Sequence, residues 1–102
     1  MGKRLELHEE LCGLLHSRNA YFQPPPNIRM SYPAIRYKIS GIDKAAANDK
    51  AYRLVNRYEI TYIDANPDST VPAMILEYFP MCSFDRWYTA DNLNHWVFTL
   101  YY

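Results

Sequence analysis

The chain has 102 residues, of which 49% are hydrophobic and 22% charged, and its 11 basic and 11 acidic side chains give a formal net charge of zero. This length suits one domain, residues 1–102, with a single core, and this composition excludes a disordered chain. The balanced charge argues against specific nucleic-acid binding through bulk electrostatics.

The first predicted element is a helix over about residues 3–17. Its leucines recur at the spacing that gathers one apolar stripe on a helix, at Leu7, Leu11, Leu14 and Leu15. A short strand at 20–23 follows and ends at three consecutive prolines, which cannot continue a ladder. The sequence therefore begins with a helix that packs through leucines and a strand that stops abruptly.

Two long strands are predicted in the middle of the chain. Apolar and polar residues alternate over 31–40 and again over 53–64, which is typical of strands with one buried face. Residues 41–52 lack that alternation and carry Gly, Asp and Asn, so we expect a mobile loop there. Loops this long in a small domain are usually functional or mobile.

The last third of the chain predicts a helix and a hairpin. Turn residues precede a short helix at about 70–79, with Pro72 in its first turn. Strands at about 81–89 and 94–102 are joined by the turn residues of "TADN". The predicted order is α-β-β-β-α-β-β, an α+β single domain with a mainly antiparallel sheet and two helices packed on one face.

Cysteine use and hydropathy bear on where the protein works. Cys12 and Cys82 are too few for a disulfide scaffold, so we expect free thiols. Charges interrupt the first residues, which lack the apolar stretch of a signal peptide. No run approaches the roughly 18 apolar residues of a membrane span. These features predict a soluble protein without membrane contacts.

A metal site is the first chemical hypothesis. His8, Cys12 and His16 recur at every fourth position of the first predicted helix, within about 80° of arc. Nitrogen and sulfur ligands at this spacing can begin a zinc or copper site, which Cys82 or His95 can complete. The same arc overlaps the leucine stripe, where free cysteine usually packs as a small hydrophobe. We therefore expect no bound metal and keep the first three residues as the candidates.

Nucleophilic catalysis is the second chemical hypothesis. Ser83 with Asp85 and His95, or Cys82 with His95, supplies the residue types of a triad or a thiol–imidazole pair. However, the sequence has no strained nucleophile turn and only three glycines, so no glycine-rich oxyanion or phosphate loop is present. We expect no catalytic residue, no cofactor and no enzymatic activity.

The stretch "CSFDRWYTADNLNH", residues 82–95, is the densest run of reactive side chains. Strand alternation places Asp85 and Arg86 on opposite faces, and the turn chemistry of "TADN" explains the polar residues locally. We interpret the stretch as a hairpin whose exposed Arg86, Trp87 and His95 contact a partner.

Four blocks of the chain carry a family resemblance that spans nearly its whole length. They are "LELHEELCGLL", "YFQPP…MSYPAI.Y", "Y..T.ID..PDS..P" and "CSFDRWYTADNLNHWVFTLYY". With these blocks the chain resembles the small tail-completion or tail-terminator proteins of long-tailed bacteriophages and prophages, also described as minor tail or neck components.

The resemblance implies a subunit of a homo-oligomeric ring, commonly a hexamer, at the head-proximal end of the virion tail. Such a ring stops tube polymerisation and helps to join head and tail, so its partners are itself, the tail tube protein and the head connector or neck proteins. Assembly takes place in the bacterial host cytoplasm, and the isolated subunit can be monomeric. No catalytic residue is transferred.

The same resemblance makes the 41–52 segment an arm towards neighbouring subunits or the tube. The expected contact residues there are Asp43, Lys44, Asn48, Asp49, Lys50 and Tyr52. Two alternatives remain open at this point. One is a head–tail neck or stopper protein, and the other, from a different class, is a metal-binding enzyme that uses the histidines and cysteine of the first helix.

Overall fold

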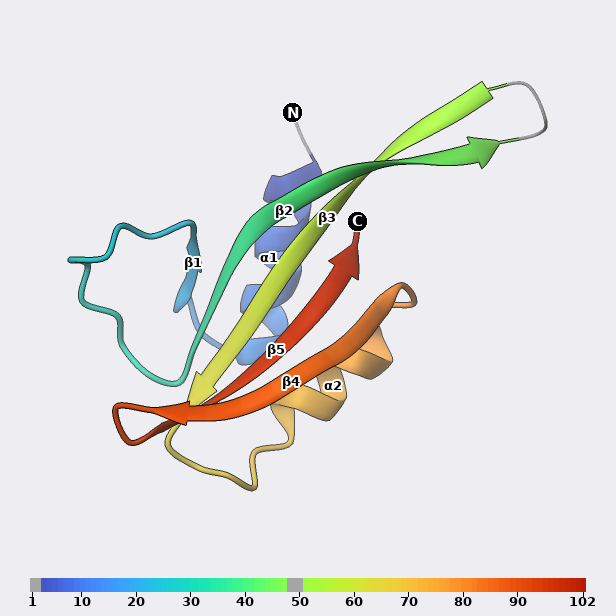
Figure 1. Cartoon of the computed structure of the whole chain (residues 1–102). Helices are drawn as coiled ribbons and strands as arrows, with labels where there is room; N and C mark the ends of the chain where they lie inside the picture. Colours follow the sequence, from blue (N-terminus) through green and yellow to red (C-terminus); the bar gives the residue numbers. More distant parts are fainter. Residues whose placement is uncertain (1–2, 48–50) are drawn as a thin grey trace.

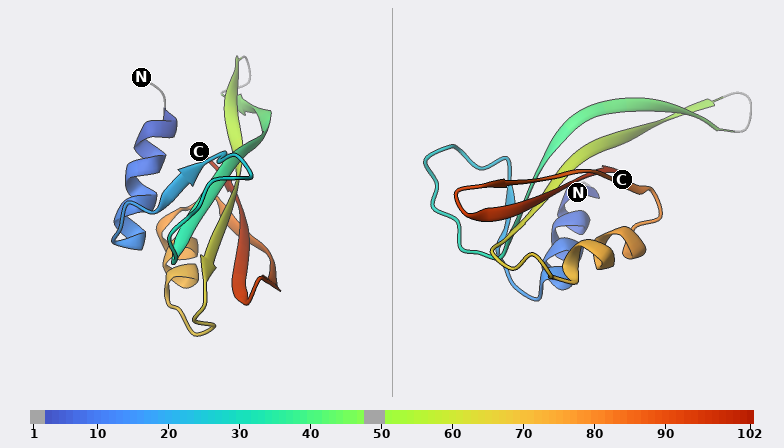
Figure 2. Two further views of the ribbon diagram at one scale, coloured as in Figure 1. Left: turned by 90° about the vertical axis from the view of Figure 1, so that its left-hand side faces the viewer. Right: turned by 60° about the horizontal axis from the view of Figure 1, so that its bottom comes forward.

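The computed structural model describes residues 3–47 and 51–102, in which two helices lie on one side of a five-stranded sheet (Figures 1 and 2). The elements in chain order are α1 (Lys3–Leu15), β1 (Ala20–Phe22), β2 (Ala34–Ala47), β3 (Ala51–Asp64), α2 (Val71–Tyr78), β4 (Cys82–Ala90) and β5 (Leu93–Tyr101). The predicted α+β order is confirmed.

The sheet has the strand order β1-β2-β3-β5-β4. β1 runs parallel to β2, and the other three neighbouring pairs are antiparallel. The short β1 covers only the first part of β2, from Ile35 to Tyr37, and β5 reaches along β3 only as far as Arg57. The sheet is therefore wide in its middle and has β4 as a long open edge.

The core lies between the helices and one face of the sheet. It is formed by buried residues of both helices and of four strands, among them Leu7, Leu11, Ile35, Tyr37, Tyr58, Ile60, Tyr62, Ile75, Phe79, Trp96, Phe98 and Leu100. The leucine stripe of α1 and every second residue of β5 are thus buried, as their spacing predicts. Burying this apolar area is the main force that holds the helices to the sheet.

Helix α1 ends two residues earlier than the sequence predicts. The amide of Ser17 donates to the carbonyl of Cys12 and that of His16 to the carbonyl of Gly13, at 3.2 Å and 3.3 Å. His16 has a φ of 58°. With these two hydrogen bonds, His16 closes the helix as a left-handed cap. His16 consequently lies outside the helical periodicity on which its alignment with His8 and Cys12 depended.

Tyr62 ties the end of β3 to the start of α2. Its buried hydroxyl donates to Asp64 Oδ2 at 2.6 Å and shares a hydrogen bond of 2.9 Å with Ser69 Oγ. Ser69 Oγ also accepts from the amide of Val71, which is in the first turn of α2. Burial, followed by the bond to the Asp64 carboxylate, raises the pKa of Tyr62 to about 12. The phenol is therefore neutral and acts as a structural donor.

The predicted loop at 41–52 is wrong for the residues that the structure describes. β2 continues to Ala47 and β3 begins at Ala51, and the two strands pair throughout. Residues 48–50 lie outside the described residues. None of the described side chains of this projecting part, at 41–44 and 54–56, is buried, so the sequence has no reason to alternate apolar and polar residues there.

A β-bulge between Ile39 and Gly41 marks the start of this projecting part. Arg57 folds across the bulge: its Nη1 donates to both oxygens of Asp43, its Nε to Ser40 Oγ and its Nη2 to the carbonyl of Ser40, all at 3.2–3.3 Å. A Cβ on Gly41 would lie 2.3 Å from Nη2 of this guanidinium. A side chain at position 41 would therefore displace the end of the Arg57 side chain from the bulge.

Replacing Gly41 by alanine is expected to lower the free energy of unfolding by about 1 kcal/mol, because the methyl group displaces the Arg57 guanidinium from these bonds. Urea denaturation of the wild type and of Gly41→Ala measures this loss. The same substitution in an Arg57→Ala background is expected to cost little, because the displaced group is already gone. An equal cost in both backgrounds would show that the guanidinium is not the reason for the glycine.

Candidate functional site

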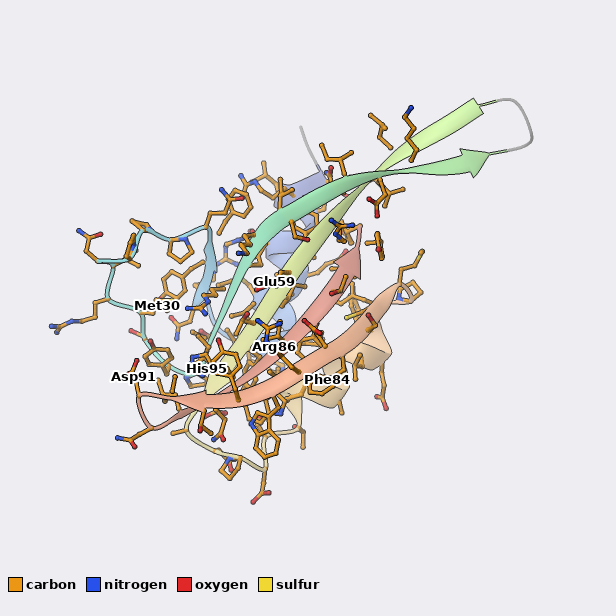
Figure 3. All side chains as sticks on the ribbon, viewed as in Figure 1. Met30, Glu59, Phe84, Arg86, Asp91 and His95 are labelled. Carbon is orange, nitrogen blue, oxygen red and sulfur yellow. The ribbon has the colours of Figure 1, made fainter. Side chains whose placement is uncertain are left out.

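β4 is an open sheet edge. It pairs only with β5, and every residue from Ser83 to Ala90 is exposed. Figure 3 shows Phe84 and Arg86 along this strand, with His95 nearer the turn that holds Asp91. A strand with one unpaired side leaves backbone donors and acceptors open to another chain. This edge contains most of the reactive stretch that the sequence singles out.

A β-bulge at Asp85 changes which face each side chain of β4 occupies. Phe84 is opposite Phe98 and Arg86 is opposite Val97, so Asp85 is the extra residue. The expected separation of Asp85 and Arg86 on opposite faces is therefore wrong. Arg86 Nη1 donates to Asp85 Oδ2 at 2.6 Å, and about half of each side chain is exposed. Strand alternation predicted the opposite because it assumes an unbroken ladder.

The bulge brings two aromatic side chains of β4 to the helix side of the sheet. The ring of Phe84 lies 5.7 Å from that of Phe98, and the ring of Trp87 is stacked on that of Trp96 at 6.1 Å. Phe84 nevertheless remains 47% exposed and Trp87 55% exposed. We call these two residues the edge surface. The predicted exposure of Trp87 is confirmed, and Phe84, which the sequence did not single out, is exposed as well.

His95 is on the other face of the same hairpin and is buried, with 7% of its surface exposed. Its ring stacks on Tyr88 at 4.7 Å, and its Nδ1 donates to the carbonyl of Leu93 at 3.2 Å. Arg36 Nη2 approaches the hydroxyl of Tyr88 at 3.5 Å. The prediction that His95 contacts a partner is therefore wrong, because Tyr88 on the edge strand covers it.

His95 is expected to make the protein less stable in mild acid. Burial lowers the pKa of His95 below its ordinary value of 6.5, and the nearby Arg36 lowers it further. Below pH 6.5 the imidazole of His95 binds a proton more readily in the unfolded chain than in the folded chain. The free energy of unfolding therefore falls as the pH falls. Urea denaturation on either side of pH 6.5 should show a smaller fall for His95→Gln than for the wild type.

His16→Gln is the matched control, because His16 is exposed. It is expected to keep the wild-type pH dependence. If His95→Gln also kept the wild-type pH dependence, the loss of stability in acid would come from titratable groups other than His95.

The turn between β4 and β5 lies within the "TADN" stretch, where the sequence predicts it, and has two residues. Ala90 pairs with Leu93, and Asp91 and Asn92 between them have φ values of 54° and 63°. Asp and Asn tolerate this left-handed conformation better than most residues, and it matches the twist of a tight hairpin.

The second candidate surface is on the projecting part of the β2–β3 hairpin. We call residues 41–47 and 51–56 the arm; it extends away from the rest of the sheet in Figure 1 and in the right-hand view of Figure 2. Ile42 is 62% exposed and Leu54 69% exposed. Ile42 is opposite Asn56 and Leu54 is opposite Lys44, which places both apolar side chains on one face. We call them the arm surface.

The contact residues expected on the arm are only partly placed. Asp43 pairs with Arg57 at 3.2 Å, so it stabilises the base of the arm as well as facing solvent. Lys44 is exposed, and Tyr52 belongs to β3 within the arm. Asn48, Asp49 and Lys50 lie outside the described residues. The apolar pair of the arm surface was missed: Ile42 lies in the segment that was interpreted as a loop, and Leu54 lies near the start of the strand predicted over 53–64.

The metal candidates are not brought together. His8 Nδ1 bonds to the hydroxyl of Tyr37 at 2.7 Å, Cys12 is buried among core residues, and His16 is exposed beyond the end of α1. Across residues 3–47 and 51–102, no three His, Cys, Asp or Glu side chains form a group that could hold a metal ion.

The two cysteines are free, and burial raises the pKa of both thiols, to about 11 for Cys82. Cys82 and Ser83 are opposite Leu100 and Thr99, whereas His95 is opposite Tyr88 further along the hairpin. The hairpin register thus keeps either candidate nucleophile away from the imidazole.

Two open grooves complete the surface. One, of about 600 Å³, lies between residues 23–30 and the outer face of β2 and β3, and includes Arg36, Lys38 and Glu59. The other, of about 580 Å³, lies at the base of the arm and includes Lys3, Leu54, Met81 and Tyr102. The sequence predicted neither, because each is formed by segments that are far apart in the chain.

Neither described helix has the length and apolar character needed to cross a membrane. No protein-family model matches this chain, and the curated proteins and solved structures likewise gave no match.

Proposed function

We propose that this chain acts by assembly, as a structural subunit that completes a bacteriophage tail. The observation that carries the proposal is the open edge at β4, where eight consecutive exposed residues, 83–90, include Phe84, Trp87 and Tyr88. Tryptophan and tyrosine are typical anchors of protein interfaces, and an unpaired edge strand is a common place for partners to dock.

The shape of the chain supports the same proposal. Its principal extents are 49 × 25 × 22 Å and its radius of gyration is 14.4 Å, whereas a compact domain of this length has a radius of gyration of about 13 Å. The arm accounts for the elongation in Figure 1. An apolar two-stranded arm that leaves the body of the domain is marginal by itself in water and gains stability when another surface covers it.

The kind of assembly follows from the resemblance of the sequence blocks to tail-completion proteins. In the proposal, copies of the chain close into a ring at the head-proximal end of the tail, stop the tube and present a surface to the neck of the head. Its partners are other copies, the tail tube protein and the head connector proteins. A ring requires a head-to-tail contact, in which two different surfaces of the subunit meet.

Deleting the gene from a phage that carries it tests this function. The expected result is tails of irregular or excessive length, seen by negative-stain electron microscopy, with heads that remain filled. Tails of normal length with heads that lose their DNA would instead identify a neck or stopper protein. Infectious particles with normal tails and filled heads would contradict a role in head–tail assembly.

A further inference from the structure

We propose that the arm surface of one copy, Ile42 and Leu54, packs against the edge surface of the next copy, Phe84 and Trp87. This inference rests on the proposed function, because a ring requires a head-to-tail contact. It adds the identity of the two surfaces that meet.

Neither surface is fully covered by the described residues of its own chain. Leu54 and Ile42 have the largest exposed fractions among the exposed large hydrophobic residues of the described chain, and Phe84 and Trp87 are about half exposed. A single chain therefore does not fold its arm onto its own edge. Two apolar surfaces at different places on one molecule can cover each other when they belong to different copies.

The accessible area is consistent with this arrangement. The chain has an accessible surface of 6742 Å² and a mass of 12.1 kDa, for which a compact monomer exposes about 6000 Å². The excess, roughly 700 Å², is close to the roughly 800 Å² that each partner buries in a standard interface. The chain therefore exposes more surface than a compact monomer of its mass, by about the area that one standard interface buries.

The charges beside the two surfaces also permit this contact. Arg86 is paired with Asp85 next to the edge surface, and Arg57 is paired with Asp43 next to the arm surface. Bringing the surfaces together therefore leaves neither pair without its counter-ion, which is the usual penalty for burying charge.

A symmetrical contact between two β4 edges is less favourable. The bulge at Asp85 interrupts the ladder in the middle of the strand, and the Asp85–Arg86 pair lies there too. Bulges and charges are the devices by which edge strands avoid pairing with their own copies. Side-chain packing of the arm against Phe84 and Trp87 does not need a continuous backbone ladder.

Two variants with complementary defects test the inference. Leu54→Glu removes the arm surface and leaves the edge surface, whereas Trp87→Glu does the reverse. Each variant alone is expected to associate about tenfold or more weakly than the wild type and to remain monomeric. An equimolar mixture is expected to form dimers and nothing larger, because only one productive contact is left. Sedimentation velocity at the highest soluble concentration measures all three samples.

Leu5→Glu is the control, since Leu5 is an exposed leucine on α1 and belongs to neither surface. It is expected to assemble like the wild type, and circular dichroism checks that each variant is folded. Wild-type assembly that persists in either variant, a mixture that stays monomeric, or a wild type that never associates would each overturn the arm-to-edge contact. The proposed function fails separately, on tail and head morphology after gene deletion.

Discussion

Deletion of Val97 is expected to prevent folding, whereas deletion of Asp85, in the neighbouring strand, is expected to be tolerated. Val97 is in β5, which pairs with β3 on one side and with β4 on the other. Removing one residue from such a strand turns half of it to the wrong face. Either Trp96 or the pair Phe98 and Leu100 would leave the core.

The size of the expected energetic loss explains why the Val97 deletion should not fold. Losing a buried aromatic residue costs about 3–5 kcal/mol, and a domain of this size has only about 5–15 kcal/mol of stability in total. The deletion exposes core side chains of β5 and buries polar side chains in their place. The combined cost is as large as most or all of the free energy of unfolding. Circular dichroism and urea denaturation of the Val97 deletion should therefore show no cooperative unfolding transition.

Asp85 behaves differently because it is the extra residue of a bulge. Without it, Phe84 is followed directly by Arg86, and ordinary alternation keeps Phe84 and Trp87 on the helix side and Arg86 on the other, as they are now. The loss is one exposed ion pair, worth about 0–1 kcal/mol. A similar loss of stability from both deletions would contradict the assigned register.

Replacing Phe98 by alanine is expected to lower the free energy of unfolding by about 3–5 kcal/mol. Phe98 is fully buried in the core, and its ring contacts that of Phe84 on the adjacent strand. Truncation removes its hydrophobic transfer energy and leaves a cavity that the sheet and helices cannot close. Urea denaturation followed by tryptophan fluorescence measures the loss.

Phe84→Ala is the matched control for Phe98→Ala. Both substitutions remove a phenylalanine ring from the contact between Phe84 and Phe98. Phe84, however, is about half exposed. Its expected cost is about 1 kcal/mol, since only part of its surface is withdrawn from water. Equal costs would mean that Phe84 is as fully buried as Phe98, which contradicts the exposure that the structure gives it. The small cost also makes Phe84 suitable for changes that probe assembly without unfolding the chain.

The assembly proposal and the stability predictions concern different residues of the same hairpin. β5 contributes the buried Trp96 and Phe98, and β4 covers it with Trp87 and Phe84, which remain open on their outer side. The interface candidates are therefore held in place by the core, and substitutions at Trp87 can be interpreted as effects on association.

Much of the fold could be predicted from local patterns. The leucine spacing of α1 and the alternation in β5 predict the faces that pack in the core, and the tight turn at Asp91 and Asn92 follows from residues that tolerate left-handed backbone. These features are local, since each depends on residues within one element or one turn. That locality is why the element order α-β-β-β-α-β-β was correct.

The candidate site could be predicted only in part. Trp87 and Arg86 are exposed as expected, but His95 is buried because Tyr88, on the neighbouring strand, stacks on it. Residues 41–52 were interpreted as a loop because they lack alternation, and the described side chains at 41–44 are not buried. Asp85 and Arg86 meet because of a bulge that no periodicity reveals.

The sequence by itself determined which residues prefer the interior, where the helices and turns fall, and that one domain forms. The tertiary structure alone decided that β4 is an edge, that its bulge directs Phe84 and Trp87 to one side, and that Ile42 and Leu54 project on an arm. The physical reason is that exposure at an edge depends on which strands are neighbours. Strand order is set by the packing of the whole sheet against its helices.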